Sequence, residues 1–136
     1  SLLAQITRHR HLSFSVQSQR YVKFGSVDKS SGFDHITPHT IDDNNEAFRV
    51  FDVAMNELQA TYDELRKLGV PAEDARMVLP NAATCNLVMT GNLRSILDFC
   101  SKRLSKQAQW EIRELAEQLK TAVVEVEPWT ESFFTK

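Results

Sequence analysis

The sequence is poor in the features that mark secreted, membrane-spanning or fibrous proteins. Its 136 residues include only 2 cysteines and 4 glycines, which leaves little basis for a disulfide framework or a collagen-like repeat. Cys85 and Cys100 also lack the C-x-x-C spacing of zinc ribbons. No apolar run approaches the ~20 residues that cross a bilayer, and no secretory signal is visible. These absences predict a cytoplasmic chain with reduced thiols and no membrane contact.

Acidic residues are absent from positions 1–27, although the net charge of the whole chain is −2. The same stretch carries Arg8, Arg10, Arg20 and Lys23, so its local field is positive. Guanidinium groups bind phosphate oxygens in a bidentate manner, and the neighbouring serine hydroxyls can complete such a site. We therefore expect these arginines, which have no nearby carboxylate in the sequence, to bind a phosphate or pyrophosphate.

Hydrophobic periodicity predicts a helix-rich α/β fold of the α+β type with a minor sheet, in a single domain over residues 1–136. A capping arrangement of Asp43 with Glu46, and a left-handed stop at Gly69, bound the longest predicted helix. Asn92 is the predicted cap of a later helix. The predicted helices cover 1–10 as the tail of a helix, 43–68, 71–79, 93–103 and 106–125, and the predicted strands cover 33–37 and 83–90.

Five ordered sequence blocks carry a resemblance to a known family. The first is R-H-R, seven residues and Ser, from Arg8 to Ser18, and it continues as S-Q-R-Y. The others are A-R-M-V-L-P-N-A at 75–82, T-G-N-L-R at 90–94, K-R at 102–103 and A-Q-W-E-I-R at 108–113. The chain resembles flavin-dependent thymidylate synthases, the thymidylate synthase complementing protein family. Several ordered blocks at compatible spacing are far more specific than one short motif.

The resemblance implies a transferase of nucleotide biosynthesis, a flavoprotein that methylates dUMP to dTMP. FAD and NADPH would supply the reducing power, and methylenetetrahydrofolate would be the carbon donor. It also implies a small antiparallel sheet and a homotetramer with shared active sites. We expect the chain to be the C-terminal two-thirds of such an enzyme, without the family's N-terminal part.

Site residues follow from the resemblance position by position. Arg103 is the expected catalytic residue, since a permanent cation beside N3 of the uracil would stabilise the anion that makes C5 nucleophilic. No cysteine nucleophile is expected. The residues expected to bind FAD are Arg8, His9, Arg10, Val16, Asn92, Leu93, Arg94 and Asp98. The residues expected to bind dUMP are Gln5, Arg8, Val16, Gln17, Ser18, Gln19, Arg20, Arg76 and Arg103.

Helical geometry adds an expectation about the shape of the site. At ~100° per residue, Arg94 and Arg103 would point to opposite sides of their helix, which favours sites closed by more than one chain. Asp98 stands where the family often has Asn, so its charge beside a diphosphate would need neutralising by Arg94. Val16 departs from the family pattern because its side chain cannot make polar contacts.

Two other classes of function stay open from the sequence. One is a noncatalytic nucleotide-binding or assembly fragment of this family. The other is a small nucleic-acid-binding module that uses the basic N-terminal stretch, although the net charge of −2 counts against it and we expect no nucleic acid partner. His35 and His39 have a metal-ligand spacing for a helix, but Pro38 excludes a regular helix there, so no metal site is expected.

Overall fold

The computed structural model describes residues 2–134. Within that range the chain divides into two compact units. We call residues 2–15 with 88–134 the terminal unit, and residues 16–87 the central unit. Each unit has its own buried core, and each is described by itself below.

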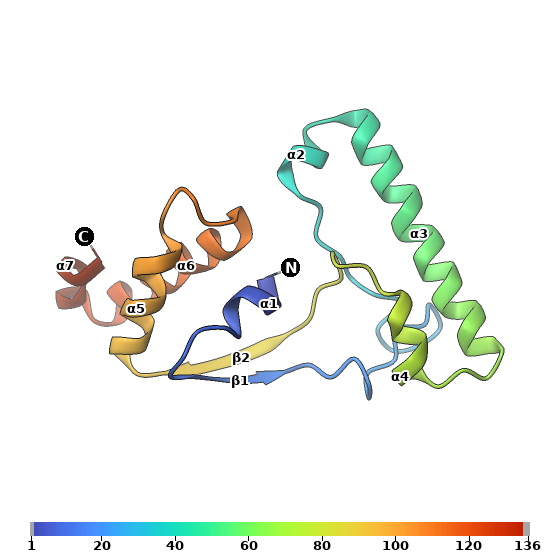
Figure 1. Ribbon diagram of the computed structural model, residues 1–136, viewed down its shortest axis with the longest axis horizontal. Helices are drawn as coiled ribbons and strands as arrows, with labels where there is room; N and C mark the ends of the chain where they lie inside the picture. Colours follow the sequence, from blue (N-terminus) through green and yellow to red (C-terminus); the bar gives the residue numbers. More distant parts are fainter. Residues whose placement is uncertain (1, 135–136) are drawn as a thin grey trace. The chain divides into compact units, whose positions relative to one another are not determined.

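Helices make up most of the terminal unit (Figure 1). They are α1 (Leu2–Ile6), α5 (Leu93–Arg103), α6 (Trp110–Val126), the short 3-10 turn Pro128–Thr130, and α7 (Glu131–Phe134). Ile6, Phe99 and Ile112 are almost fully buried, together with Cys100 and Ala116. Burial of a large apolar side chain is worth roughly 1.5–3 kcal/mol, so these contacts between α1, α5 and α6 hold the unit together.

Strands β1 (Leu12–Val16) and β2 (Leu87–Gly91) pair in a two-stranded sheet. Their arrows run in opposite directions in Figure 1. The pairing continues past the strands, where the backbone N–H of Gln17 donates to the carbonyl of Asn86 at 2.8 Å. The side chain of Gln17 accepts from the N–H of Asn86 at 2.9 Å, so a side chain replaces the next rung of the ladder.

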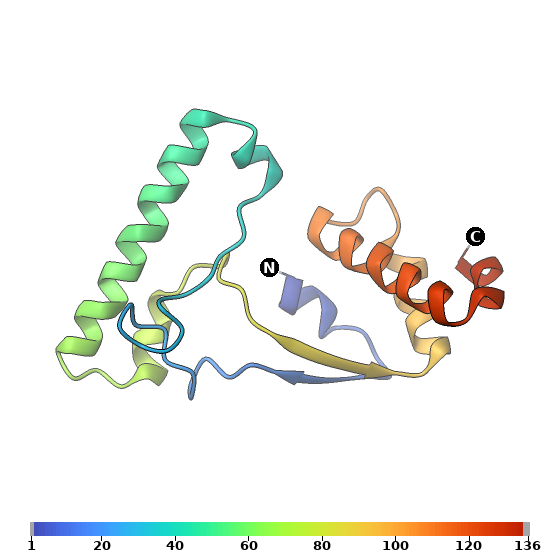
Figure 2. The same ribbon diagram turned by 180° about the vertical axis from the view of Figure 1, so that it is seen from behind.

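The central unit is built on α3 (Asn45–Lys67), preceded by α2 (His39–Asp42) and followed by α4 (Ala72–Ala75) and the 3-10 turn Arg76–Val78. The loop before α2 folds back beside α3, as Figure 2 shows from behind. Tyr62, fully buried, accepts a hydrogen bond from the N–H of Phe24, and Gln59 donates to the carbonyl of the same residue. A core formed by Phe24, Phe33, Met55, Tyr62 and Ala75 lies between this loop and the helices.

The predicted fold class is confirmed, since the described chain is helix-rich with a small antiparallel sheet. The helix 93–103 and its cap Asn92 are also confirmed. Gly69 has φ +86°, the left-handed stop that was predicted for the end of α3. The single-domain organisation over 1–136 stays a prediction.

Several local predictions were wrong. Asn44, not Asp43, caps α3, because its side chain accepts from the N–H groups of Glu46 and Ala47. The segment 33–37 forms only an isolated bridge between His35 and Ala83, and β1 was not predicted at all. Cys85 lies before β2, not within a strand. Helix α6 begins at Trp110 because Gln109 caps it, after a turn in which Ala108 bonds back to Ser105.

Candidate functional site

The turn between α1 and β1 presents four consecutive basic side chains, Arg8 to His11. The N–H groups of Thr7 and His9 donate to the carbonyls of Leu3 and Ile6 in α1, and the hydroxyl of Thr7 also donates to the carbonyl of Leu3, at 2.8 Å. His11 has φ 63°, a left-handed conformation that reverses the chain into β1. The R-H-R motif is therefore placed by a helix end on one side and a strand on the other.

Helix α5 faces this turn and begins at a well-defined cap. The side-chain oxygen of Asn92 accepts from the backbone N–H of Ser95 at 2.9 Å and from its hydroxyl at 3.0 Å. Such caps satisfy amide groups that the first turn of a helix leaves open. The cap fixes where α5 starts after β2, and so fixes the position of each α5 side chain along the cavity that follows.

A cavity of about 840 Å³ lies between the turn and α5, entirely within the terminal unit. Its volume falls in the usual range for sites that bind cofactors and substrates. The side chains that line it are strongly basic, with one carboxylate among them. The lining residues are Arg8, His9, Arg10, His11, Asn92, Arg94, Ser95, Asp98, Lys102 and Arg103.

Asp98, the carboxylate in this cavity, is paired with Lys102. The ammonium group lies 2.6 Å from its Oδ2, one helical turn further along α5. This hydrogen bond lowers the pKa of Asp98 from its ordinary value. The expectation that Arg94 would neutralise Asp98 was therefore wrong in its choice of partner, because Lys102 lies at the equivalent spacing on the other side.

The guanidinium groups of Arg8, Arg10 and Arg94 make no hydrogen bond or ion pair with another side chain in the described range 2–134. Their donors are available to a ligand. Since guanidinium groups bind phosphate oxygens strongly, the free donors make this cavity suited to an anion that carries phosphate.

Arg103 lines the same cavity as Arg94, so the expectation that they point away from each other was wrong. Backbone rotation of ~100° per residue places their Cβ atoms on opposite sides of α5. Arg103, however, is the last residue of the helix, and its long side chain reaches the turn at His9. The length of the Arg103 side chain therefore brings its guanidinium into the cavity even though its Cβ atom lies on the other side of the helix.

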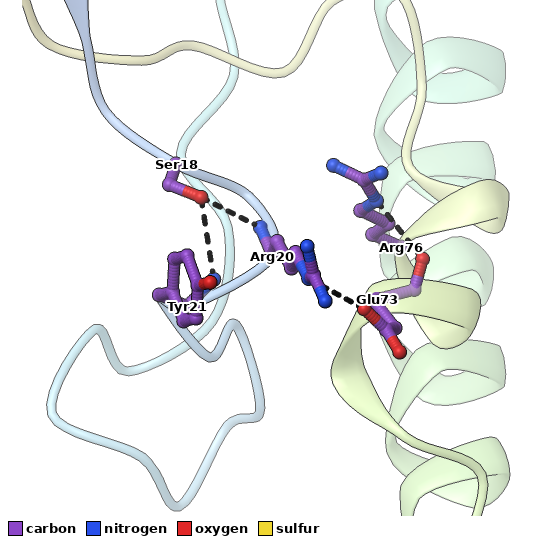
Figure 3. Close-up of polar contacts among 5 residues, drawn as sticks. All are labelled: Ser18, Arg20, Tyr21, Glu73 and Arg76. Carbon is purple, nitrogen blue, oxygen red and sulfur yellow. Dashed lines mark hydrogen bonds and ion pairs between the residues drawn. The ribbon is translucent and has the colours of Figure 1, made fainter.

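A second basic cluster lies in the central unit (Figure 3). Nε of Arg20 is 2.6 Å from a carboxylate oxygen of Glu73, and Nε of Arg76 donates to the backbone carbonyl of Glu73 at 2.9 Å. The hydroxyl oxygen of Ser18 accepts from the N–H groups of Arg20 and Tyr21 at 3.2 and 3.4 Å. Three predicted dUMP ligands, Ser18, Arg20 and Arg76, are thus linked with Glu73 by hydrogen bonds and one ion pair.

The predicted absence of any partner for Arg20 was wrong. Glu73 neutralises it, and its guanidinium also lies 5.5 Å from the ring centre of Tyr21. The side chains of Arg20 and Glu73 are 57% and 44% exposed, so water screens this ion pair. Exposed pairs contribute only about 0–1 kcal/mol, which leaves Arg20 free to exchange its partner for an incoming phosphate.

The other predicted ligands lie elsewhere in their units. Gln5 donates to Gln109 at 3.3 Å, and the side chain of Gln17 is engaged with the backbone of Asn86. Leu93 faces a separate apolar cavity of about 340 Å³ between α5 and α6. Val16 ends β1, and Gln19 follows it in the turn before Arg20. The roles given to these residues stay predictions.

Sequence reasoning missed four residues of these two clusters. Lys102 and Ser95 line the cavity at helical spacings from Asp98, and His11 directly follows the R-H-R motif. Glu73 lies three residues before Arg76, inside a segment whose similarity was noted only from residue 75 onward. The spacing of opposite charges along one helix was the available signal for Lys102.

The cysteines are free thiols in both units. Burial raises the pKa of Cys100 to about 11, and its Sγ donates to the carbonyl of Ala116 at 3.7 Å. Such a thiol stays protonated at neutral pH and is a poor nucleophile.

Between residues 2 and 134 there is no group of three or more His, Cys, Asp or Glu side chains arranged to hold a metal ion. Over the same range, no helix has the length and apolarity to span a membrane.

Fold and basic cavity define a helix-rich protein suited to phosphate-bearing ligands, and comparison with known proteins gives its family. The family described as thymidylate synthase complementing protein matches residues 1–129. The chain belongs to this family.

Curated relatives agree with that assignment. A flavin-dependent thymidylate synthase of Halobacterium salinarum is 40% identical, over 98% of this chain and 62% of its own length. One from Geobacter sulfurreducens is 42% identical, over 91% of this chain and 52% of its own length. The chain thus spans between half and two thirds of the length of these relatives.

Among solved structures, the UMP/dUMP methylase PolB from Streptomyces cacaoi, bound with 5-Br dUMP, is similar with a TM-score of 0.81. It is 28% identical in sequence, and the match covers 98% of this chain and 65% of PolB. The similarity extends over both units of the present chain, so the fold of each is shared with a nucleotide methylase.

Proposed function

We propose that this chain forms the flavin- and nucleotide-binding part of an enzyme that methylates dUMP to dTMP. The observation that carries the proposal is the basic cavity of the terminal unit. Arg8, Arg10, Arg94, Lys102 and Arg103 line it, and its one carboxylate, Asp98, is already paired with Lys102. The family relationship suggests the reaction, and the positive charge of the cavity matches the negative charge of the phosphate groups that these ligands carry.

The donor set fits the diphosphate of FAD. Arg8, Arg10 and Arg94 have free guanidinium donors on the cavity wall, and a diphosphate offers several anionic oxygens to them. Asn92 and Ser95 add polar groups at the start of α5. When bound, the flavin supplies the redox chemistry, with NADPH as the source of reducing equivalents and methylenetetrahydrofolate as the carbon donor.

In this proposal Arg20, Arg76 and Ser18 bind the phosphate of dUMP. The Ser18 oxygen accepts two backbone N–H groups, which leaves its hydroxyl proton to donate to a phosphate oxygen. Arg103 acts on the pyrimidine by holding a permanent positive charge near N3, which stabilises the anion that makes C5 reactive. No step requires a nucleophilic cysteine.

Assembly is part of the same proposal, as a homotetramer with shared active sites. Val50 and Val53 are exposed on neighbouring turns of α3, and Val50 also lines an apolar cavity of about 430 Å³. Contiguous exposed apolar surface marks interaction sites. Sedimentation should give a species larger than a monomer. A stable monomer at high concentration would contradict the proposed assembly.

The test of the main proposal is the visible spectrum of the purified chain after incubation with FAD, followed by titration with dUMP. Bound flavin gives the protein a visible absorption band, and the dUMP titration should saturate at one nucleotide per site. Absence of flavin with retained dUMP binding would favour a noncatalytic nucleotide-binding fragment. Binding of neither, together with retention on DNA, would favour the nucleic-acid module.

A further inference from the structure

Arg103 and His9 form a hydrogen bond between α5 and the turn after α1. Nε of Arg103 lies 2.8 Å from Nε2 of His9, at a separation of 94 residues in the sequence. Guanidinium nitrogens only donate hydrogen bonds, so Nε2 of His9 is the acceptor and carries no proton. A neutral ring in this geometry carries its proton on Nδ1.

The imidazole itself is held in place by packing. Its ring centre lies 4.7 Å from that of Phe99 in an edge-to-face arrangement, at an interplanar angle of 68°. Phe99 is fully buried in the core of the terminal unit. An edge-to-face contact with a fully buried ring restricts the orientation of the imidazole. Phe99 in the core therefore restrains His9, and His9 in turn restrains the guanidinium of Arg103.

We propose that His9 is a positioning residue for Arg103: its neutral imidazole accepts the Nε–H and so orients the remaining guanidinium donors towards the pyrimidine. This inference rests on the proposed function and adds to the role in FAD binding that the family resemblance implies. Arginine has several rotatable bonds, and a guanidinium that must meet N3 gains from being ordered before the substrate arrives.

The charges around His9 favour the neutral ring. Asp98, Lys102 and Arg103 face it from α5, and Arg8, Arg10 and His11 come from its own turn. Burial, followed by the positive charges of Arg103 and Lys102, lowers the pKa of His9 from its ordinary value of 6.5, and Asp98 opposes this change. Protonation would replace the acceptor with a second cation and break the bond to Arg103.

The contact can be tested without catalysis or flavin. Long-range ¹H–¹⁵N correlation spectra of the imidazole should give the Nδ1–H tautomer for His9 at neutral pH. Arg103→Ala should move the His9 titration midpoint upward, because it removes both a neighbouring cation and the hydrogen-bond donor. An Nε2–H tautomer in the unmodified protein would overturn the proposal.

The positioning role can be tested with 5-fluoro-dUMP, whose N3 ionisation is visible in its ultraviolet spectrum. Three proteins are compared: the unmodified chain, His9→Gln and His9→Leu. Gln keeps an acceptor oxygen but does not titrate, whereas Leu offers no acceptor. We expect bound 5-fluoro-dUMP to ionise more readily in the unmodified protein and in His9→Gln. In His9→Leu the N3 acidity constant of the bound nucleotide should fall roughly tenfold, towards the value of the free nucleotide.

The titration of N3 separates positioning from simple packing. In the unmodified protein the N3 pKa of bound 5-fluoro-dUMP, obtained from its titration, should lie below that of the free nucleotide, and His9→Gln should keep this shift because its amide oxygen still accepts from Arg103. Equal N3 acidity in His9→Leu and the unmodified protein, with Arg103→Ala still impaired, would overturn the positioning role alone. Failure of the unmodified protein to bind 5-fluoro-dUMP would instead count against the proposed function, and the tautomer measurement would still decide the contact.

Discussion

Glu73 joins Arg20 to helix α4 by an ion pair in which the carboxylate oxygen lies 2.6 Å from Nε of the guanidinium. The backbone carbonyl of the same residue accepts from Nε of Arg76 at 2.9 Å. One residue therefore orients two cationic side chains, one through its side chain and the other through its backbone. Figure 3 shows both contacts.

The first prediction concerns the phosphate of dUMP. Arg20→Ala and Arg76→Ala should each weaken dUMP binding by about 1.5–3 kcal/mol, the usual cost of losing a hydrogen bond to a charged group. Calorimetric titration measures this directly. Arg49→Ala is a matched control, since Arg49 is an exposed arginine on α3 with no part in the cluster. Unchanged affinity in both cluster variants would exclude them from the phosphate site.

The second prediction concerns the charge of Glu73. Glu73→Gln keeps an oxygen that can accept from Arg20 but removes the negative charge that competes with phosphate. Because exposed ion pairs are worth about 0.2–1 kcal/mol, dUMP affinity should rise by a factor of roughly 1.4 to 5. The gain should shrink as salt is added, since salt screens exposed charges. A loss of affinity would mean that the carboxylate serves binding rather than opposing it.

A third prediction concerns the close approach of β2 to β1. A Cβ atom at Gly91 would lie 2.4 Å from Cδ2 of Leu12, well inside contact distance. Because Cδ2 is the end of a half-buried side chain that can move aside, Gly91→Ala should destabilise the fold by about 1 kcal/mol, the lower end of the usual cost of overpacking. Denaturation in urea gives the change in the free energy of unfolding.

A double-mutant cycle with Leu12→Ala provides the control. Removal of the Leu12 side chain clears the space that the new methyl group needs, so the double variant should be less destabilised than the sum of the two single variants. Simple additivity would place the cost of Gly91→Ala in the backbone instead of in this contact.

Sequence reasoning succeeded where structure is set locally. Helix α5 was predicted with its observed limits because Asn92 is a strong cap and the apolar positions recur with helical spacing. It failed for β1, whose Ser-rich sequence Leu-Ser-Phe-Ser-Val gains a partner only from β2, far along the chain. Strand formation depends on such distant pairing more than on intrinsic preference.

The candidate site divides in the same way. The R-H-R motif and residues 92–94 were identified from the family resemblance. Seven of the predicted residues share one cavity: Arg8, His9, Arg10, Asn92, Arg94, Asp98 and Arg103. Arg94 and Lys102 both stand four residues from Asp98, and this spacing alone could not decide which of them pairs with it. Lys102 rather than Arg94 binds Asp98, and Glu73 binds Arg20 from a distant segment of the chain. Ion pairs between distant segments depend on the fold.

The fourth prediction is a pH dependence of stability that originates in His9. Its pKa in the folded protein lies below its ordinary value of 6.5, so the unfolded chain binds the proton more tightly. Stability should therefore be fully present above about pH 6.5 and should decline as the pH falls towards the folded pKa. His9→Gln should flatten this part of the profile in thermal unfolding measured across pH. If the slope of stability against pH is unchanged in His9→Gln, the pH dependence originates in other titratable groups.

The last prediction separates Arg103 from the cysteines in the flavin-loaded protein. Cys100 has a pKa of about 11 because it is buried, so its thiol is protonated at neutral pH and cannot readily attack a pyrimidine. Replacing Cys85 with Ser and Cys100 with Ala should leave dTMP formation within a small factor. Arg103→Lys should lower it sharply, because an ammonium group lacks the Nε that binds His9 and the planar set of donors. NADPH oxidation measured alongside dTMP locates the defect: continued oxidation without dTMP places it at the pyrimidine. A cysteine variant that folds and binds both flavin and dUMP, yet makes no dTMP, would show that a thiol takes part in the reaction.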